Sequence, residues 1–549
     1  MPGPGDASKA AAPMLIPTDD YHRLYDDFRW PVPPRFNIAE ACCDRHADGG
    51  GRLALIDVDE DGAAARHSFD ELARWSRRFA NVLRGDGLQR GERVAVFLSQ
   101  SVELPIVHLA AFRSGLVSVP LFMLFGEDAL AFRLANSGAR AIVTDAAGAA
   151  KIVPLRARLP DLAQVYVVAD APPAGTRAFW RAIDEADETF DNVPTGPDDP
   201  AIIIYTSGTT GNPKGALHAH RVLLGHLPCV EMVHDFFPRP GDVYWTPADW
   251  AWIGGLFDAL FPAWYHAVPI VAHRARKFEP RAAMQLMADY GVRNVFLPPT
   301  ALKLMRQAGV RHDGVRLRSI LSGGESLGAE LLDWVRATFG VDAHEIYGQT
   351  ECNLVVGNNA RLFPIRPGSM GRAIPGFDVR VVDPRGNVLP DGQQGIIGVR
   401  APNPCMMLEY WRNPDATAAK YGGDFLLTGD LGVRDSDGYF WYVSREDDVI
   451  TSAGYRIGPS EIEHTLLRHP AVALAAVVGV PDPVRTEAIK AWIVLRPQFS
   501  PSADLAREIQ DFVKEKLAAH EYPRHVEFTD TLPMTATGKV LRRELRGRG

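Results

Sequence analysis

The feature that most constrains the fold of this chain is a short apolar strand followed directly by a glycine-rich loop. Residues 201–205 (AIIIY) are apolar throughout, as expected for a strand buried on both faces of a parallel sheet. Further strands are predicted at 93–98, 141–143 and 319–321, and a helix is predicted over 104–113. Alternation of strands and helices over about 400 residues predicts an α/β fold of stacked layers with mostly parallel sheets.

The pattern changes twice along the chain. Residues 1–35 are rich in Pro, Gly and Ala and predict a loosely packed N-terminal arm. Residues 36–446 are expected to form the large α/β region, and about 376–446 to be a β-rich subdomain because 379–400 has the pattern of a β-meander. Residues 447–549 have the pattern of a small α+β domain that is large enough to fold alone.

In this small domain, strands are expected at 473–480 and 491–495. Ser460 and Glu463 have the spacing of a capping box before its first helix. A second helix is predicted to start at Ser502.

Composition excludes several classes of protein. The chain has 549 residues, of which 46% are hydrophobic and 23% charged, which is typical of an ordinary soluble globular protein rather than a disordered or fibrous one. Its net charge of −8 disfavours nucleic-acid binding. The sequence predicts neither a signal peptide nor a membrane span, and its five scattered cysteines predict a reducing compartment. A cytoplasmic location is therefore expected.

The loop after the apolar strand has the composition of a phosphate-binding site. Residues 205–215 (YTSGTTGNPKG) hold three glycines, four hydroxyl groups of Ser and Thr, and a single lysine, Lys214. Glycines let backbone amides converge on an anion, hydroxyls add donors, and the lysine adds positive charge. The loop is not a Walker A motif, because Lys214 is followed by glycine rather than by Ser or Thr.

This loop resembles the phosphate loop of the adenylate-forming superfamily, which includes acyl-CoA synthetases, luciferases and peptide-synthetase adenylation domains. Other motifs of that superfamily follow in the same order, so the resemblance covers nearly the whole chain. They are 347–351 (YGQTE), 427–430 (LTGD), 444–448 (SREDD) with 454–456 (GYR), and 533–539 (PMTATGK).

The resemblance implies that ATP, Mg²⁺ and coenzyme A are bound. The residues expected to hold the phosphates are Thr206, Ser207, Gly208, Thr209, Thr210, Gly211 and Lys214. Tyr347 is expected to stack on adenine, and the nucleotide site is completed by Glu325, Ser326, Glu345, Gly348, Gln349 and Thr350. Asp430 and Arg445 would bind the ribose, and Glu351 would hold Mg²⁺.

Lys539 is the expected catalytic residue, since its compact positive charge can bridge the attacking carboxylate and the α-phosphate. By resemblance, Asp447 is the hinge about which the small domain turns. Coenzyme A is expected to contact Ala453, Gly454, Tyr455, Arg456 and Arg485. Relatives often carry a lysine where this chain has Glu521, so one expected phosphate contact of coenzyme A is missing.

The acyl pocket is expected to be formed by Trp252, Ile253, Gly254, Gly323 and Gly348. Acetate-specific relatives place tryptophan at the position of Gly348, so the glycine predicts a pocket that lacks one wall. Because each buried CH₂ contributes roughly 0.8 kcal/mol, a longer chain would then be favoured. Along 450–463 and 481–485 the sequence looks closest to medium-chain acyl-CoA synthetases.

Three alternatives stay open. Residues 324–328 (GESLG) match the nucleophile elbow of a serine hydrolase, in which Ser326 would attack the substrate. An adenylating enzyme could instead load an amino or aryl acid onto a carrier protein, with Asp249 holding an amine. A luciferase-like oxygenase shares the same motifs. The expected partners are a small carboxylic acid, ATP and CoA, and the sequence leaves assembly into a homo-oligomer open.

Overall fold

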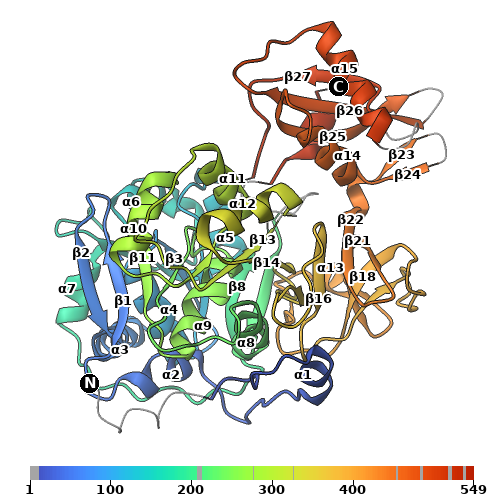
Figure 1. Cartoon of the computed structure of the whole chain (residues 1–549). Helices are drawn as coiled ribbons and strands as arrows, with labels where there is room; N and C mark the ends of the chain where they lie inside the picture. Colours follow the sequence, from blue (N-terminus) through green and yellow to red (C-terminus); the bar gives the residue numbers. More distant parts are fainter. Residues whose placement is uncertain are drawn as a thin grey trace.

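The computed structural model describes residues 12–206, 213–275, 277–324, 327–452, 455–482, 486–516, 522–535 and 539–548, without the side chains of residues 447, 451, 455, 456 and 461. Most of these residues form a large body, and the last hundred form a smaller unit that stands above it in red (Figure 1). The mixed α/β architecture expected from the sequence is confirmed.

Two sheets form the large body. The first, in spatial order, consists of β17 (Val379–Val382), β18 (Gly395–Arg400), β21 (Phe425–Arg434), β22 (Phe440–Arg445), β16 (Ser369–Ala373), β15 (Val356–Gly357), β14 (Ala343–Tyr347), β13 (Ser319–Gly323), β12 (Asn294–Phe296), β10 (Tyr244–Trp245), β11 (Ile270–His273), β1 (Leu53–Val58) and β2 (Ala64–Ser68), with β20 (Tyr421–Gly422) beside β21. The second consists of β19 (Glu409–Tyr410), β9 (Gly215–Ala219), β8 (Pro200–Tyr205), β4 (Val117–Pro120), β3 (Arg93–Phe97), β5 (Ala139–Asp145), β6 (Gln164–Val168) and β7 (Arg177–Ala178).

Buried strands place successive side chains in different layers. In β3, Val94 and Val96 pack into the core between the two sheets, whereas Ala95 and Phe97 pack into the core on the other face. This alternation follows from the two-residue period of a strand. It also explains why β8, and β3 after its first residue Arg93, are apolar, because both faces of their sheet are covered.

Helices fill the layers on both sides of the sheets. The helices packed between the sheets are α3 (Phe69–Gly85), α4 (Glu103–Arg113), α8 (Val222–Val233) and α9 (Phe261–Tyr265), with α2 (Ile38–Cys42) and α7 (Phe179–Asp184) in the same core. The outer face of the first sheet is covered by α10 (Pro280–Asp289), α11 (Pro299–Gln307) and α12 (Ala329–Phe339). The outer face of the second is covered by α5 (Glu127–Ser137) and α6 (Ala146–Leu155).

All five cysteines are buried, and burial raises the pKa of each thiol.

The predicted β-meander is present as an antiparallel extension of the first sheet. β17 pairs with β18, β18 with β21, and β21 with β22. Gly386 turns the chain after β17 with a φ of 84°, a conformation that favours glycine. Pairing of β16 with both β15 and β22 joins this extension to the parallel strands.

The prediction of a loosely packed arm is wrong for residues 12–35. The amides of Met14 and Leu15 donate to the carboxylate of Glu231 in α8 at 3.0 and 2.8 Å. Tyr21 and Tyr25 in α1 (Tyr21–Asp27) donate their hydroxyls to the carbonyls of residues 373 and 377, and α1 lies against the β-rich extension in Figure 1. The proline and glycine content of residues 1–35 indicated an irregular chain. Hydrogen bonds from the aromatic side chains of α1 and to the buried Glu231 carboxylate nevertheless hold the arm against the large body.

The smaller unit has its own sheet and core. Its strands, in spatial order, are β24 (Tyr455–Ile457), β23 (Ile450–Ser452), β26 (Thr486–Leu495) and β25 (Val472–Asp482), with β27 (His525–Phe528) beside β26. Its helices are α14 (Pro459–Leu467), α15 (Ala503–Lys516) and α16 (Arg542–Arg546). Ser502 accepts the amide of Leu505, so the predicted start of α15 is confirmed.

The capping box predicted at Ser460 is wrong. Helix α14 begins at Pro459 and its N-cap is Gly458, which places Ser460 inside the first turn. Glu463 instead accepts three hydrogen bonds from the guanidinium of Arg542, at 3.2, 2.8 and 2.6 Å, and one from the amide of Val477 at 2.7 Å. Arg542 and Arg546 also pair with Asp448, so α16 is tied to the segment that follows β22.

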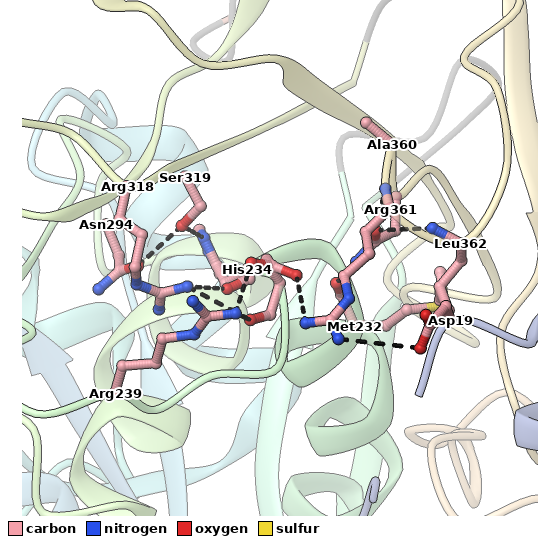
Figure 2. Close-up of polar contacts among 12 residues, drawn as sticks. Asp19, Met232, His234, Arg239, Asn294, Arg318, Ser319, Ala360, Arg361 and Leu362 are labelled. Atoms are coloured by element: carbon pink, nitrogen blue, oxygen red, sulfur yellow. Dashed lines mark hydrogen bonds and ion pairs between the residues drawn. The ribbon is translucent and has the colours of Figure 1, made fainter. Parts of the chain in front are cut away.

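A buried polar chain joins α8 to the strands of the first sheet (Figure 2). The ring of His234, at the end of α8, contacts the Ser319 hydroxyl at 2.6 Å and the Tyr244 hydroxyl at 2.6 Å. Ser319 in turn lies 2.7 Å from the side-chain oxygen of Asn294.

Among the described residues, no helix is both long enough and apolar enough to cross a membrane.

Docking of the arm can be tested with two adjacent substitutions. Leu15 is 3% exposed and packs into the main core, whereas Ile16 is 80% exposed. We expect Leu15→Ala to lower the free energy of unfolding by roughly 2–4 kcal/mol, because burial is lost and a cavity is left. Ile16→Ala should change it by less than about 0.5 kcal/mol. Equal urea midpoints for the two variants would show that the arm is not docked.

Candidate active site

The expected nucleotide residues gather where neighbouring strands end. The phosphate loop leaves the carboxyl end of β8, Gly323 ends β13, and Tyr347 ends β14. Ligands of open α/β sheets bind at the carboxyl ends of the strands. The antiparallel strands β21 and β22 bring Asp430 and Arg445 to the same edge, because the two residues are direct cross-strand partners.

A backbone hydrogen bond joins the two described ends of the phosphate loop. The Thr206 amide donates to the Lys214 carbonyl at 2.9 Å, where the β8–β9 ladder ends. The residues between them that were expected to bind phosphate, 207–211, lie outside the described residues, as do Glu325 and Ser326. The Lys214 ammonium lies 5.2 Å from the centre of the Tyr410 ring.

Glu351 is held by a residue that the sequence analysis did not identify. Tyr410, in the edge strand β19, donates its hydroxyl to the Glu351 carboxylate. Glu351 is only 8% exposed, and burial together with the carboxylate charge raises the pKa of Tyr410, so the phenol keeps its proton. Tyr410 thus connects the lysine expected at the phosphates with the carboxylate expected at the metal.

Asp430 is the centre of the site. Its Oδ2 atom accepts hydrogen bonds from the Tyr347 hydroxyl at 2.7 Å and from Nε2 of Gln349 at 2.9 Å. Its Oδ1 atom lies 3.4 Å from Nε of Arg445. The structure therefore brings together four residues that the sequence placed in three separate motifs. Thr350 is half-buried in the same loop.

Glu345 is a buried carboxyl behind this loop. Its side chain accepts the amide of Leu327 at 3.0 Å. Burial raises the pKa of Glu345 to about 8, and the Leu327 amide opposes that shift only in part. The group is thus mostly protonated at neutral pH, which suits a structural role beside the nucleotide better than ionic contact with phosphate.

Two of the expected acyl residues, Trp252 and Ile253, directly precede the π-helix Gly254–Leu260. Trp252 packs against the rings of Phe122 and Phe125, with centroids 5.6 and 6.1 Å away, and Ile253 is buried beside it. Asp249 accepts the amide of Ala251 at 2.7 Å and so shapes the turn before Trp252. Burial raises the pKa of Asp249 to about 6.

Two of the expected pocket glycines approach other groups closely. A Cβ added at Gly254, in the π-helix Gly254–Leu260, would lie 3.1 Å from the ring of Phe296. One added at Gly323 would lie 2.5 Å from the side chain of Ile346 in β14. Gly323 therefore allows β13 and β14 to pack.

The structure gives a second reason for glycine at position 348, beside the expected open wall of the acyl pocket. A Cβ at Gly348 would lie 2.2 Å from the amide nitrogen of Leu354 and 2.9 Å from the carbonyl carbon of Asn353. Both are backbone atoms, so the loop after 347–351 must move before any side chain fits. The close approach of two chain segments thus favours glycine here, a reason that a single sequence does not reveal.

Lys539 lies in the smaller unit and is exposed. Its amide donates to the Thr535 hydroxyl at 3.0 Å, and its carbonyl accepts the Thr535 amide at 2.7 Å. Of the residues expected at coenzyme A, Ala453, Gly454 and Arg485 lie outside the described residues, and only the backbone of Tyr455 and Arg456 is described, in β24. The side chain of Asp447 is likewise not described.

Comparison with known proteins identifies the family. Residues 43–411 match "AMP-binding enzyme" and residues 461–539 match "AMP-binding enzyme C-terminal domain". The rat (Rattus norvegicus) acyl-coenzyme A synthetase ACSM4, mitochondrial, is 37% identical over 97% of this chain and 94% of its own. The acetyl-coenzyme A synthetase of Bacillus subtilis is 36% identical over 96% of this chain and 94% of its own.

A solved structure agrees with these matches. The anthranilate CoA ligase AuaEII in complex with anthranoyl-AMP superposes with a TM-score of 0.85, at 29% identity over 94% of this chain and 98% of that one. The chain therefore belongs to the AMP-binding enzyme family, as an AMP-forming acid–thiol ligase of the acyl-CoA synthetase type.

The raised pKa of Glu345 predicts a pH dependence of stability. The folded state keeps a proton that the unfolded state releases above about pH 4.5, so the stability that Glu345 contributes is complete below that pH and is lost as pH rises through about 8. Glu345→Gln accepts the Leu327 amide equally well but does not titrate. Urea midpoints at pH 5.0, 6.5 and 8.5 should fall more steeply for the wild type. Parallel curves would contradict the prediction.

Gly348→Ala should destabilise the protein by roughly 1–3 kcal/mol, because a methyl group would clash with backbone that packing holds in place. Gly85→Ala is the control, since a Cβ there meets nothing within 4 Å and lies within α3. It should be neutral or stabilising. The midpoint of thermal unfolding measures both effects. A Gly348→Trp variant that folds normally would show that the loop yields easily.

Proposed function

We propose that this protein joins a carboxylic acid to coenzyme A in two steps and releases AMP and pyrophosphate. The convergence of Tyr347, Gln349 and Arg445 on the carboxylate of Asp430 carries the proposal, since it builds a hydrogen-bonding site for ribose hydroxyls at the strand ends. Glu351 and Lys214, connected through Tyr410, supply charge beside it.

In the first step, a carboxylate oxygen of the acid attacks the α-phosphorus of ATP. A bond from this oxygen to phosphorus forms, and the bond from phosphorus to the bridging oxygen of pyrophosphate breaks and leaves its electron pair on pyrophosphate. Positioning and positive charge are the main catalytic devices for such a transfer. Thr206 and Lys214 would hold the β- and γ-phosphates together with residues 207–211.

Glu351 fits a Mg²⁺ site of the kind that uses one carboxylate together with substrate phosphates. Mg²⁺, when bound there, would neutralise charge on the phosphates. No group of three or more acidic, His or Cys side chains suited to a metal occurs among the described residues. Tyr410 would orient the Glu351 carboxylate toward the nucleotide.

Lys539 would reach the α-phosphate when the smaller unit turns about Asp447. Its exposed position leaves the ammonium available for that contact. In the second step, the thiol sulfur of coenzyme A attacks the acyl carbonyl, the thiol proton passes to solvent, and AMP leaves with the electron pair of the carbon–oxygen bond. Residues 453–456 and Arg485 would line the path of coenzyme A.

A medium-chain fatty acid is the acid that we propose. Trp252, Phe122 and Phe125 form an apolar cluster beside the strand ends, and such surface rewards an alkyl chain. The relatives compared above include one named for acetate and one for anthranilate, so the chain length has to be measured. We place the reaction in the cytoplasm on the sequence argument alone, although the rat relative is named mitochondrial.

A screen of acids separates the proposed reaction from its alternatives. Pyrophosphate release would be followed with straight-chain, branched and aromatic acids, each with and without coenzyme A. We expect release that depends on the acid and acyl-CoA formation when the thiol is present. An adenylate that never passes to coenzyme A would favour the carrier-loading alternative. Activity abolished by Ser326→Ala and untouched by Lys539→Ala would favour the hydrolase.

Lys539→Ala should lower the rate of acyl-adenylate formation by at least about 100-fold, because a charge that stabilises the transition state is lost. Thioester formation from added acyl-adenylate should fall by less than about threefold, since that step does not use this ammonium. Lys516→Ala, at the exposed end of α15, is the control and should leave both steps unchanged. Equal loss of both steps would contradict the assignment of Lys539.

A further inference from the structure

Lys420 is a half-buried lysine that no sequence motif identified. It directly precedes β20, the short strand that pairs with β21 and therefore with the strand that carries Asp430. Its ammonium donates to the side-chain oxygen of Gln349 at 2.9 Å and to the carbonyls of Leu427 and Thr428, each at 3.1 Å. All three N–H groups of the lysine thus have an acceptor.

These contacts determine how the amide of Gln349 is oriented. A lysine can only donate, so it selects the amide oxygen of Gln349 and turns the NH₂ group the other way. That NH₂ group donates to the carbonyl of Thr428 at 3.0 Å and to Oδ2 of Asp430 at 2.9 Å. Without the lysine, a flipped amide would place two acceptors against each other at Asp430.

The orientation of this amide decides which oxygen of Asp430 is available. Tyr347 and Gln349 together occupy Oδ2, which leaves Oδ1, 3.4 Å from Nε of Arg445, as the acceptor that a ligand can reach. We propose that Lys420 is a positioning residue that sets ribose recognition by fixing Gln349 against Asp430. This inference rests on the proposed nucleotide site and adds a specificity determinant to it.

The charge of Lys420 suits this task for a second reason. Gln349, Thr428 and Asp430 present several acceptors within a small volume, and a neutral donor would satisfy only part of them. A hydrogen bond from a charged donor is also shorter and stronger than a neutral one. Lys420 therefore stiffens the junction between the loop after β14 and strand β21, which hold the two halves of the site.

The test compares the affinities of ATP and 3′-deoxy-ATP, measured by isothermal titration calorimetry in the full-length protein. In Lys420→Met, the ratio of the dissociation constant of 3′-deoxy-ATP to that of ATP should fall by about tenfold, because one charge-assisted contact no longer fixes the hydroxyl acceptor. KM for ATP should rise by a similar factor, with kcat at saturating ATP changed by less than about threefold. A merely structural role would lower the fraction of active protein and leave the ratio intact.

Lys490→Met is the matched control. Lys490 is also a largely buried lysine, paired with Glu527 at 2.7 Å, but it lies in β26 of the smaller unit. In Lys490→Met, the ratio of the dissociation constant of 3′-deoxy-ATP to that of ATP should equal the wild-type ratio within about twofold. In a Gln349→Leu background, Lys420→Met should change the ratio by less than about twofold, since a residue that acts through Gln349 has nothing left to orient.

Asp430→Ala separates this proposal from the one on which it rests. If Asp430→Ala abolishes the discrimination and Lys420→Met leaves it unchanged, the role of Lys420 is wrong and the ribose site stands. If Asp430→Ala leaves the discrimination unchanged, the ribose site itself is wrong and both proposals fall. Should Lys420→Met not fold, Gln349→Glu replaces it, because the carboxylate keeps the lysine contact but removes the N–H that Asp430 accepts. An unchanged ratio in that variant overturns the proposal.

Discussion

The site depends on the hydrogen bonds that the carboxylate of Asp430 accepts. Asp430 lies in an antiparallel strand, whereas Tyr347 and Gln349, which donate to it, follow the end of a parallel strand more than eighty residues earlier in the chain. Without these hydrogen bonds the β-rich extension and the parallel strands would share a sheet but no binding site. Because the carboxylate is 5% exposed and has partners on both oxygens, its removal would leave several buried donors unsatisfied.

Much of the layered fold could be predicted from local patterns. The strand β8 was predicted because a run of apolar residues such as Ile202–Ile204 can only lie between two covered faces. The predicted start of α15 at Ser502 is confirmed, because the Ser502 hydroxyl accepts the amide of Leu505. The capping box failed because Glu463 binds Arg542, which lies almost eighty residues away, and a partner so distant leaves no trace in the local spacing.

For the site, residues within the sequence motifs were predicted, and residues outside the motifs were not. Residues within motifs, such as Gln349 and Asp430, came together as the resemblance implied. Tyr410 and Lys420 were missed because their importance comes from contacts with other motifs and not from their neighbours in sequence. The close backbone at Gly348 was missed, since a missing side chain can reflect an open pocket or a close backbone, and the sequence does not show the position of Leu354.

The burial of every cysteine has a consequence for an enzyme that handles a thiol substrate. Disulfide exchange needs a thiolate that oxidised coenzyme A can reach. Burial raises the pKa of Cys352, in the loop beside Glu351, to about 12, and it leaves the other four thiols equally protonated at neutral pH. Burial thereby shields the five cysteines from mixed disulfides with oxidised coenzyme A.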